Sequence, residues 1–337
     1  MDNNNKVNNR FVLSIAPHIH AGANTNRMMF MVVVALTPAI VMSVLLFHRS
    51  AVVYAATIIS ALLFEAVCSK IMGKEHTLGD FSAFVTSILL AMNLPATAPV
   101  WMCIVGSFVA IVIAKMVFGG LGCNPFNPAL VARIFLLISF PVQMTTYIAP
   151  SMGGVDAVSA ATVMSAAKVY SQAHGGLDGY VLPSAYQSFL GFQAGALGET
   201  SAIALLIGGL FLLLARVITW HIPVSFLCTA ALLVCTHHWA HPDAILPPLV
   251  QLFSGGLILG AFFMATDYVT SPLYPAGKLI FGAGCGVITI MIRIFGNYPE
   301  GVAFSILVMN AATPLLDRYL RPRAYGEASI FERDVSK

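Results

Sequence analysis

Residues 28–47 read MMFMVVVALTPAIVMSVLLF, a run of 20 residues without a charged side chain. As an α-helix this run would be about 30 Å long, which matches the hydrocarbon thickness of a bilayer. The whole chain has the same character: of 337 residues, 58% are apolar and 9% are charged, and the mean hydropathy is +0.85. An ordinary soluble domain carries about 25% charged residues. The sequence therefore predicts an integral membrane protein and excludes both a soluble globular protein and a nucleic-acid partner.

Nine further apolar runs follow the first one. They are about twice as long as the roughly ten residues of a barrel strand, so we expect helices as the spanning elements. The ten candidates are residues 28–47, 51–69, 80–95, 99–118, 126–145, 202–220, 222–238, 247–265, 277–295 and 300–316. This pattern predicts an all-α fold with about ten transmembrane segments. The predicted parts are an N-terminal tail (1–27), a five-helix half (28–145), a polar loop (146–199), a second five-helix half (200–317) and a C-terminal tail (318–337).

The basic residues predict the orientation in the membrane. With the N-terminus inside, thirteen Lys and Arg residues fall on cytoplasmic segments and helix ends, against three, Arg49, Lys168 and Arg293, on the outer side. Cytoplasmic loops carry the excess of positive charge in membrane proteins. We therefore expect a multi-pass protein of the cell's inner membrane with both termini in the cytoplasm and the loop 146–199 outside. Residues 1–27 lack the basic and apolar regions of a cleavable signal.

The two halves resemble each other in sequence. Phe81-Ser82 begins a run that ends in LLAMNLPATAP (89–99), and 172 positions later Phe253-Ser254 begins one that ends in FFMATDYVTSP (262–272). Because each half has five spans, an odd number, a duplicated half would lie upside down relative to its twin. The pattern predicts two inverted five-helix repeats, with chance similarity between apolar segments as the alternative.

The third and eighth runs are too short to cross a bilayer as plain helices. The 14 residues from Phe81 to Leu94 would give roughly 21 Å of helix against a hydrocarbon layer of about 30 Å. Short segments with Pro or Gly in matching positions of two halves point to broken helices that hold a ligand near the membrane centre. The alternative is a pair of tilted or re-entrant packing helices.

Three ionisable residues within the apolar runs are candidates for function, because such groups are costly in a membrane. They are Glu65, Arg133 and Asp267. Asp267 follows the short eighth run and is the best candidate for ion handling, with Glu65 as a second; Glu65 and Arg133 are alternatively a structural ion pair.

We predict no metal site of the chain's own. The six cysteines form no CxxC motif, and His237, His238 and His241 read more simply as solvated loop residues than as metal ligands.

Four stretches together resemble a known family. They are GGLGCNPFNPALVARIFLLISFPVQM (119–144), GALGETSAIALLIGGLFLL (195–213), FFMATDYVTSP (262–272) and GNYPEGVAFSILVMNAATPLLD (296–317). They look like the family of D subunits of the Rnf electron-transport complex, which is related to the B subunits of the sodium-pumping NADH:quinone oxidoreductase. The resemblance implies a membrane component of a translocase that links ferredoxin and NAD and moves sodium ions or protons. It also implies the A, B, C, E and G subunits of Rnf and a flavin transferase as partners.

The resemblance further implies a flavin mononucleotide (FMN) joined by a phosphodiester to a threonine in a D-x-x-S-x-A-T motif. The matching residues here are Asp156, Ser159 and Thr162. Such a bond requires a hydroxyl that a transferase can reach, and we expect Thr162 to lie in an exposed small-residue segment whose turn Asp156 orders. Without the resemblance, the segment would read as a plain linker.

Two further groups of residues are candidate flavin contacts. Glu199, Thr200 and Ser201 lie where the loop returns to the membrane, and a helix N-terminus there would suit an anionic ligand; the alternative is a capped helix start. Asn124 and Asn127 match asparagines near a second, noncovalent flavin in the related family, which implies riboflavin on the cytoplasmic side; the alternative is helix capping.

A different class of function, a passive channel or solute carrier, stays open because inverted repeats with broken helices are typical of transporters.

Overall fold

The computed structural model describes residues 24–73, 77–148, 159–174, 185–191, 193–240, 246–296 and 301–322. These residues form a bundle of helices together with one pair of two-residue antiparallel strands, β1 (Tyr147–Ile148) and β2 (Ser159–Ala160). The prediction of a helical membrane protein is confirmed, and the two short strands are an addition to it.

Every predicted run contains a helix. The first half comprises α1 (Thr25–Leu46), α2 (Ser50–Ile71), η1 (Thr77–Asp80), α3 (Ser82–Met92), α4 (Val100–Phe108), η2 (Val109–Met116), α5 (Pro128–Ser139) and α6 (Pro141–Thr145). Next come α7 (Val163–His174), α8 (Ala185–Leu190) and η3 (Leu197–Glu199). The second half comprises α9 (Ala202–Leu214), α10 (His221–Ala240), α11 (Pro248–Phe253), α12 (Leu257–Leu259), η4 (Gly260–Met264), α13 (Pro275–Phe295) and α14 (Val302–Tyr319). The segments η2 and η4 are π-helical.

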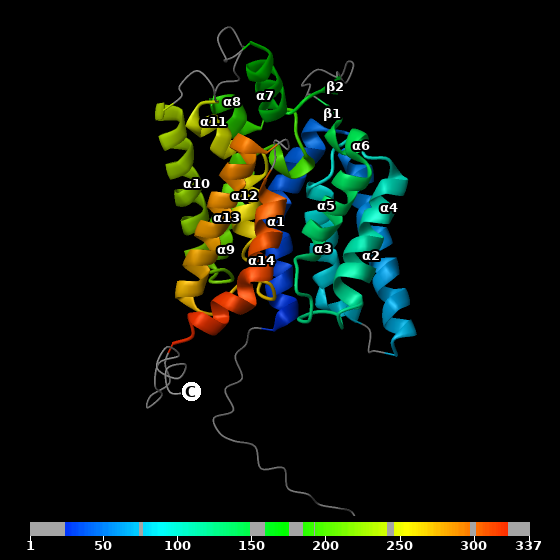
Figure 1. Ribbon diagram of the computed structural model, residues 1–337. Helices are drawn as coiled ribbons and strands as arrows, with labels where there is room; N and C mark the ends of the chain where they lie inside the picture. The colour runs from blue at the N-terminus through cyan, green and yellow to red at the C-terminus, as the bar shows by residue number, and fades with distance from the viewer. Residues whose placement is uncertain are drawn as a thin grey trace, which may run out of the picture.

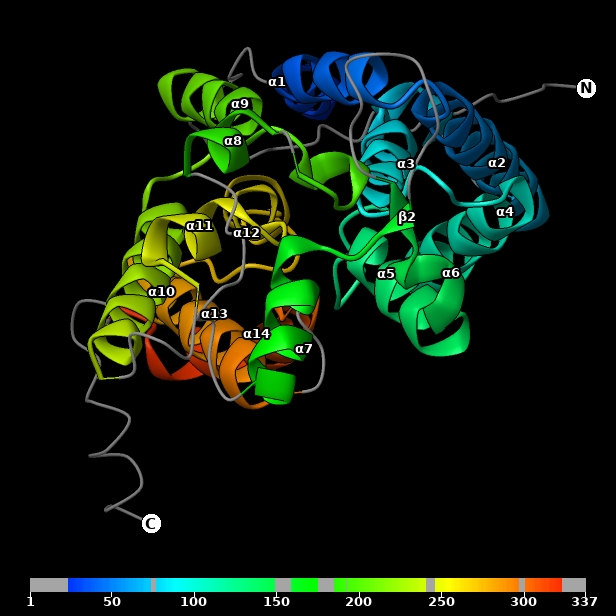
Figure 2. The ribbon, with the colours of Figure 1, turned by 90° about the horizontal axis from the view of Figure 1, so that it is seen from above.

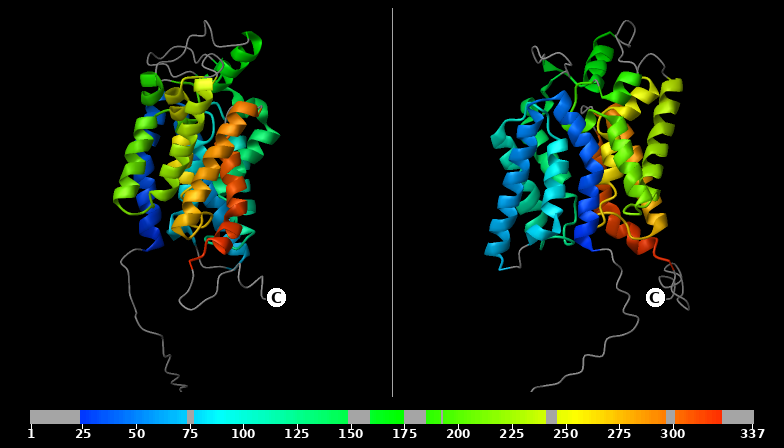
Figure 3. Two further views of the ribbon diagram at one scale, coloured as in Figure 1. Left: turned by 60° about the vertical axis from the view of Figure 1, so that its left-hand side comes forward. Right: turned by 180° about the vertical axis from the view of Figure 1, so that it is seen from behind.

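The bundle has two distinct ends. One end carries α7, α8 and α11, and we call it the loop face; α1 begins and α14 ends at the opposite end, which we call the terminal face (Figures 1 and 3). Seen from the loop face, α1–α6 form one group and α9–α14 another, and α1 lies beside α9 where the groups meet (Figure 2). The helices before β1 and those after η3 thus lie in two neighbouring groups.

Among the described residues, four helices are long and apolar enough to cross a bilayer, judged by length and composition: α1, α2, α10 and α13. The continuous helix formed by α4 and η2, and the helices α3, α5 and α9, are apolar but shorter. Short apolar helices fit a membrane protein in which some segments cross as a helix plus an extended stretch.

Glycines set the closest contacts between helices. A Cβ built on Gly208 of α9 would collide with the carbonyl oxygen of Ala35 on α1, and one on Gly209 would lie 2.6 Å from the Phe262 ring. On α13, a Cβ on Gly286 would lie 2.9 Å from Thr229 of α10. Small residues let membrane helices approach closely and gain van der Waals contact, which takes the place of the hydrophobic effect in lipid.

The third and eighth runs are broken, as the sequence predicts. Helix α3 ends at Met92, and a stretch of turns, residues 93–99, continues to α4. The eighth run is not one segment: Gly255 and Gly256, with φ of 72° and 66°, separate α11 from α12. Glycine permits this left-handed backbone at little cost, so the break lies at these two residues.

Polar side chains satisfy the unwound backbone after η4. Thr313 Oγ1 donates to the Thr270 carbonyl at 3.0 Å, and the Leu273 amide donates to Asp317 Oδ1 at 2.9 Å. With its amide nitrogen facing acceptors, Asn310 also donates to the Thr270 carbonyl, at 3.3 Å. Positions 310, 313 and 317 lie on one face of α14, since helical neighbours recur every three to four residues. This face replaces the hydrogen bonds that the broken helix lost.

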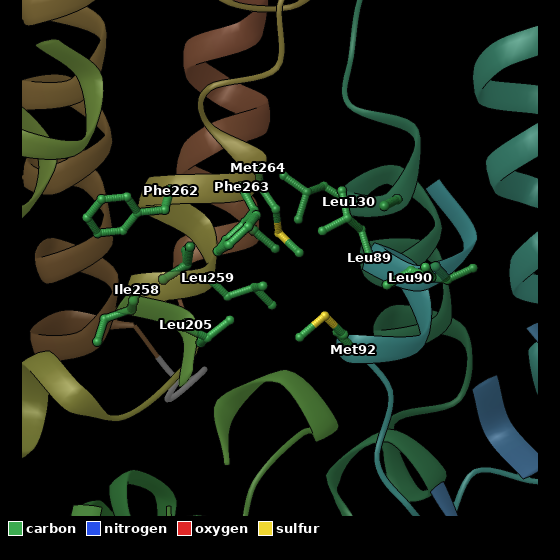
Figure 4. Packing of buried hydrophobic residues seen from close by; sticks show 14 of the residues in the cluster. Leu89, Leu90, Met92, Leu130, Leu205, Ile258, Leu259, Phe262, Phe263 and Met264 are labelled. Atoms are coloured by element: carbon green, nitrogen blue, oxygen red, sulfur yellow. The ribbon is translucent and has the colours of Figure 1, made fainter. Parts of the chain in front are cut away.

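Large apolar side chains fill the centre of the bundle. Leu89 and Met92 of α3 point toward Leu259 and Met264 of the second half (Figure 4). Leu90, Met92 and Met264 are 0–1% exposed. The ends of the two broken helices thus meet in a tightly packed core.

Candidate functional site

Thr162 begins helix α7 at the loop face. Its Oγ1 accepts a hydrogen bond from the Ser165 amide at 3.2 Å, and the two hydroxyls lie 2.8 Å apart. This is an N-cap, which stabilises the first turn of a helix. The side chain is 5% exposed, so the expectation of an exposed hydroxyl is wrong in this structure. The physical reason is the cap itself, because a hydroxyl bonded into the first turn faces the protein.

A small pocket of about 10 Å³ lies beside Thr162, and we call it the loop-face pocket. It is lined by Thr162, Val163, Met164, Gln193, Ala194, Glu199, Ser254 and Gly255. Gln193 joins its walls: Nε2 donates to the carbonyls of Glu199 at 3.4 Å and Phe253 at 3.3 Å, and Ser254 Oγ donates to Oε1 at 2.9 Å. The turn before the second broken helix therefore forms one wall of the Thr162 pocket.

Arg293 near the end of α13 fixes this turn. Its guanidinium donates to the carbonyls of Gln251, Ser254 and Gly255 at 2.7, 3.1 and 3.2 Å, and the residue is 6% exposed. A Cβ built on Gly255 would lie 2.7 Å from Arg293 Nη2 and 3.0 Å from Met164 Sδ. Arg293 is therefore a buried residue behind Gly255 of the pocket wall, at the same end of the bundle as Lys168, with which the orientation count grouped it.

Lys168 ties α7 to the same helix. Its Nζ donates to the Arg293 carbonyl at 3.2 Å and to the Gly296 carbonyl. Burial lowers the pKa of this lysine from its usual value of 10.5. The carbonyls at a helix C-terminus are a favourable place for a cation. Helix α7, which Thr162 begins, is thus docked on the second half.

Glu199 connects the pocket to the centre of the bundle. Its Oε1 lies 3.5 Å from Arg133 Nη2, and both residues are 5% exposed. Cβ atoms on Gly195 and Gly256 would lie 2.9 and 3.1 Å from the Glu199 carboxylate oxygens, so glycines make room for this side chain. The alternative of a capped helix start is confirmed at Ser201, but Glu199 itself also pairs with an arginine of α5.

The neighbours of Glu199 have structural roles instead. Ser201 Oγ caps α9 by accepting from the Ala204 amide at 3.3 Å, and Thr200 Oγ1 donates to the Leu197 carbonyl at 3.0 Å. Neither residue lines the loop-face pocket. Asp156 lies outside the described residues, and Ser159 is described only as part of strand β2, which pairs with Ile148 of β1.

A larger cavity of about 80 Å³ opens between the halves toward the terminal face, and we call it the terminal-face cavity. Its polar lining residues are Ser82, Thr86, Lys115, Asn124, Asn127, Thr266 and Asp267, and its apolar lining includes Met28, Met29, Phe262 and Phe263. The structure therefore brings Asp267, Asn124 and Asn127, three of the predicted site residues, into one place.

Both asparagines also support the fold. Asn127 Oδ1 caps α5 by accepting from the Ala129 amide at 3.1 Å, and Nδ2 donates to the Met264 carbonyl at 3.2 Å. Asn124 Nδ2 donates to the Phe126 carbonyl at 3.0 Å. The capping alternative is therefore confirmed for Asn127, which in addition joins α5 to the end of η4.

Glu65 pairs with Lys115, so the predicted alternative of a Glu65–Arg133 ion pair is wrong. Lys115 Nζ lies 2.7 Å from Glu65 Oε1 and donates to Ser82 Oγ at 2.8 Å. Glu65 is 0% exposed and does not line the cavity, whereas Lys115 does. No sequence pattern pointed to this pair, because residues 50 positions apart on different helices meet only in the fold.

The histidines do not form a loop cluster. His237 and His238 lie in the last turn of α10, and His241 is outside the described residues. Within the described ranges there is no group of three His, Cys, Asp or Glu side chains that could hold a metal ion.

Sequence reasoning missed Gln193 as a site residue and gave Lys115 and Arg293 no role beyond the charge count. Gln193 is uncharged, so nothing in its pattern distinguishes it from a loop or capping residue. Lys115 and Arg293 both end an apolar run, and the cost of a buried charge was the available signal.

The chain matches a known family over nearly its whole length. The sequence model described as "NQR2, RnfD, RnfE family" matches residues 12–326. The chain is 44% identical to the D subunit of the Na(+)-translocating ferredoxin:NAD(+) oxidoreductase complex of Acetobacterium woodii, over 94% of this chain and 96% of that protein. It is 42% identical to the proton-translocating counterpart of Clostridium ljungdahlii, over 94% and 97%. It is 38% identical to the D subunit of an ion-translocating oxidoreductase complex of Escherichia coli, over 94% and 98%.

Proposed function

Because this chain belongs to the NQR2, RnfD, RnfE family, we propose that it is the D subunit of an ion-translocating ferredoxin:NAD oxidoreductase complex and relays electrons through a covalently bound flavin. The flavin mononucleotide is attached by a phosphodiester to Thr162. The single observation that carries this assignment is the hydroxyl of the matched threonine, held at the N-terminus of a 12-residue helix beside a polar pocket.

The residues around Thr162 fit a phosphate group. Backbone N–H groups at a helix N-terminus favour an anion, and Arg293 places a second positive charge behind Gly255. The glycine itself leaves space, since a Cβ there would contact both Arg293 and Met164. The pocket of about 10 Å³ has room for little more than one water molecule, so it can take at most part of the phosphate, and the isoalloxazine ring lies outside it.

When bound, the flavin supplies the one- and two-electron chemistry, which amino acid side chains do not. The chain's own residues hold it at the loop face: Thr162 tethers it, Lys168 docks its helix, and Gln193 fixes the pocket wall. A tether keeps the local concentration of a cofactor high at a water-exposed surface.

We propose that the terminal-face cavity receives the translocated cation and that Asp267 is its carboxylate ligand. Carboxylate, amide and hydroxyl oxygens are suitable ligands for a hard cation. The cavity is smaller than the about 150 Å³ that admits benzene, so the riboflavin that the family resemblance implies at Asn124 and Asn127 would need it to widen. In this form the space suits water and a small ion better than an aromatic ring.

Coupling would follow from charge. Flavin reduction adds negative charge at the loop face, and this charge would raise the affinity of the terminal-face cavity for a cation. By thermodynamic linkage, a cation bound in the cavity would then favour the reduced flavin to the same extent. Identical flavin reduction potentials with and without sodium ions or protons at the cavity would contradict this part of the proposal.

We propose that the terminal face lies in the cytoplasm of a bacterial cell and the loop face outside it. With the buried Lys115 and Arg293 left out, the basic residues still divide twelve against two in favour of a cytoplasmic terminal face. The other Rnf subunits and the flavin transferase are the expected partners on these faces.

The inverted-repeat proposal is supported by two cations in corresponding positions. In the first half, Lys115 lies near the end of the fourth span and donates to the Ser82 hydroxyl at the start of α3. In the second half, Arg293 lies near the end of the fourth span and donates to the Ser254 carbonyl shortly before α12. The first contact is at the terminal face and the second at the loop face. This is the arrangement expected of two copies related by a half-turn in the membrane plane.

The test uses flavin fluorescence of the denatured protein purified from its native host. Wild type and Thr162→Ser, which keeps a hydroxyl, should give a fluorescent band and the mass of one added flavin mononucleotide. Thr162→Val should give a dark band of unmodified mass. A dark wild-type band of unmodified mass would remove the redox role and favour a channel or carrier, and a bright Thr162→Val band would move the attachment elsewhere.

A further inference from the structure

The two broken helices end beside each other in the core. Asn93 follows the last residue of α3, and its Nδ2 lies 3.7 Å from the sulfur of Met264, the last residue of η4. Helix C-termini carry partial negative charge. In transporters built from inverted repeats, the ends of such half-helices are where a cation is held.

Here a guanidinium fills that position. Arg133 Nη1 donates to Asn93 Oδ1, and Nη2 lies 3.5 Å from Glu199 Oε1. We call Asn93, Arg133 and Glu199 the central cluster; its residues are 1%, 5% and 5% exposed. A carboxylate oxygen and an amide oxygen near two helix C-termini are a set of ligands for a small cation, and the arginine side chain takes its place.

The central cluster separates the two cavities. Asn127, six residues before Arg133 on α5, lines the terminal-face cavity, and Glu199 lines the loop-face pocket. Six residues of helix are about 9 Å, so Arg133 lies roughly that far from each end of α5. A route through the middle of this chain from one cavity to the other would have to pass Arg133.

Close packing surrounds the cluster. A Cβ built on Gly198 would lie 2.7 Å from Leu259 and 2.8 Å from Met92, so the segment that carries Glu199 lies directly against both broken helices. The Leu197 amide donates to the Leu94 carbonyl at 3.0 Å, which fixes the same contact by a backbone bond. Buried apolar side chains of the broken helices, among them Met92, Leu259 and Met264, pack around this contact (Figure 4).

We propose that Arg133 is a resident cation that occupies the ion site between the broken helices and closes the direct path through this chain. A sodium ion or proton that enters the terminal-face cavity can reach Asp267 but cannot continue past Arg133 to the loop-face pocket. The complete crossing therefore uses another part of the complex, and this protein contributes the cavity and the redox centre. Arg133 has this role whether or not Thr162 carries a flavin.

The experiment measures passive ion flux through the intact complex in phospholipid vesicles without an electron donor. Uptake of radioactive sodium and the signal of an internal pH dye are recorded under an imposed membrane potential that is negative inside. Arg133→Gln exposes Glu199 and Asn93 to an entering ion, and we expect its flux to exceed that of wild type by about tenfold or more. A flux equal to wild type for both ions would overturn the proposal.

Glu199→Gln is the matched control. It removes the carboxylate but keeps the guanidinium, so the path should stay closed to both ions. If it leaks as much as Arg133→Gln, loosened packing and not the missing cation explains the flux, and the proposal fails. Flavin fluorescence of the same preparations reports Thr162 separately.

Two further variants cover the case that Arg133→Gln does not assemble. Arg133→Lys keeps a cation and should be as tight as wild type, whereas a leaking Arg133→Lys complex would contradict a resident cation. The double variant Arg133→Met with Glu199→Met replaces the pair by apolar side chains of similar size. Its ion flux should also be as low as that of wild type, because it removes the Glu199 carboxylate together with the Arg133 guanidinium.

Discussion

Removing the carboxylate of Glu65 while leaving Lys115 in place should destabilise the protein strongly. The two charges are 2.7 Å apart, and their side chains are 0% and 3% exposed. At that distance and an effective dielectric constant of about 20, their attraction is about 6 kcal/mol. Taking each ion out of water costs several kcal/mol, so attraction and desolvation nearly cancel in the native pair.

Glu65→Leu abolishes the attraction and leaves the cost of burying Lys115. We expect the free energy of unfolding to fall by about 3–5 kcal/mol, which is typical of a buried pair that loses one partner. The double variant Glu65→Leu with Lys115→Met removes both costs, and its stability should equal or exceed that of wild type by up to about 4 kcal/mol. The bond from Lys115 to Ser82 is lost in the double variant, which reduces this gain by about 1–3 kcal/mol.

The assay is reversible unfolding of the purified protein in mixed micelles, titrated with a denaturing detergent and followed by tryptophan fluorescence. Lys115→Met alone is the control that leaves the Glu65 carboxylate buried without Lys115, and its free energy of unfolding should also fall. A loss below about 1 kcal/mol for Glu65→Leu, or a double variant as unstable as the single ones, would refute the account of a mutually neutralising buried pair.

The geometry also predicts the outcome of three other substitutions. Gly208→Ala should lower the free energy of unfolding by about 1–3 kcal/mol or more, because the added Cβ would collide with the Ala35 carbonyl. The control Gly79→Ala adds its Cβ to open space and should leave the stability unchanged, and equal effects of the two substitutions would contradict this. Arg293→Ala should lose about 3 kcal/mol or more in the same assay, because three buried carbonyls lose a charged donor, and unchanged stability would count against that role. Burial lowers the pKa of Lys168 in the folded protein, so between that pKa and 10.5 the unfolded chain binds more protons than the folded one. The free energy of unfolding of wild type should therefore rise with pH relative to that of Lys168→Met in this range. Parallel stability curves for the two proteins, in unfolding titrations up to about pH 10.5, would contradict this.

The helices were predictable from sequence because the signal for them is local. Runs such as 28–47 correspond to α1 within a few residues, and the short third run is a broken helix as its length predicted. A break in the eighth run was expected, but its position was not. It depends on the left-handed backbone of Gly255 and Gly256, and a glycine pair inside an apolar run fits close packing equally well.

The partners of the charged residues were not predictable. Glu65 and Arg133 were both recognised as costly, and each has a partner on a distant segment, Lys115 and Glu199, that no spacing rule connects to it. Asp267, Asn124 and Asn127 were selected for different reasons, and only the fold places them in one cavity. Sequence identifies which residues need a partner, but the topology decides which partner they find.

The N-cap at Thr162 has a consequence for biogenesis. On the proposed assignment, an enzyme must bring its own active site to an oxygen that the finished fold keeps almost entirely covered. Attachment therefore precedes the docking of α7, and once the helix has settled, the same burial shields the ester linkage from water. Maturation would then have a fixed order, with modification first and closure second, and a molecule that closes early would remain permanently without its cofactor.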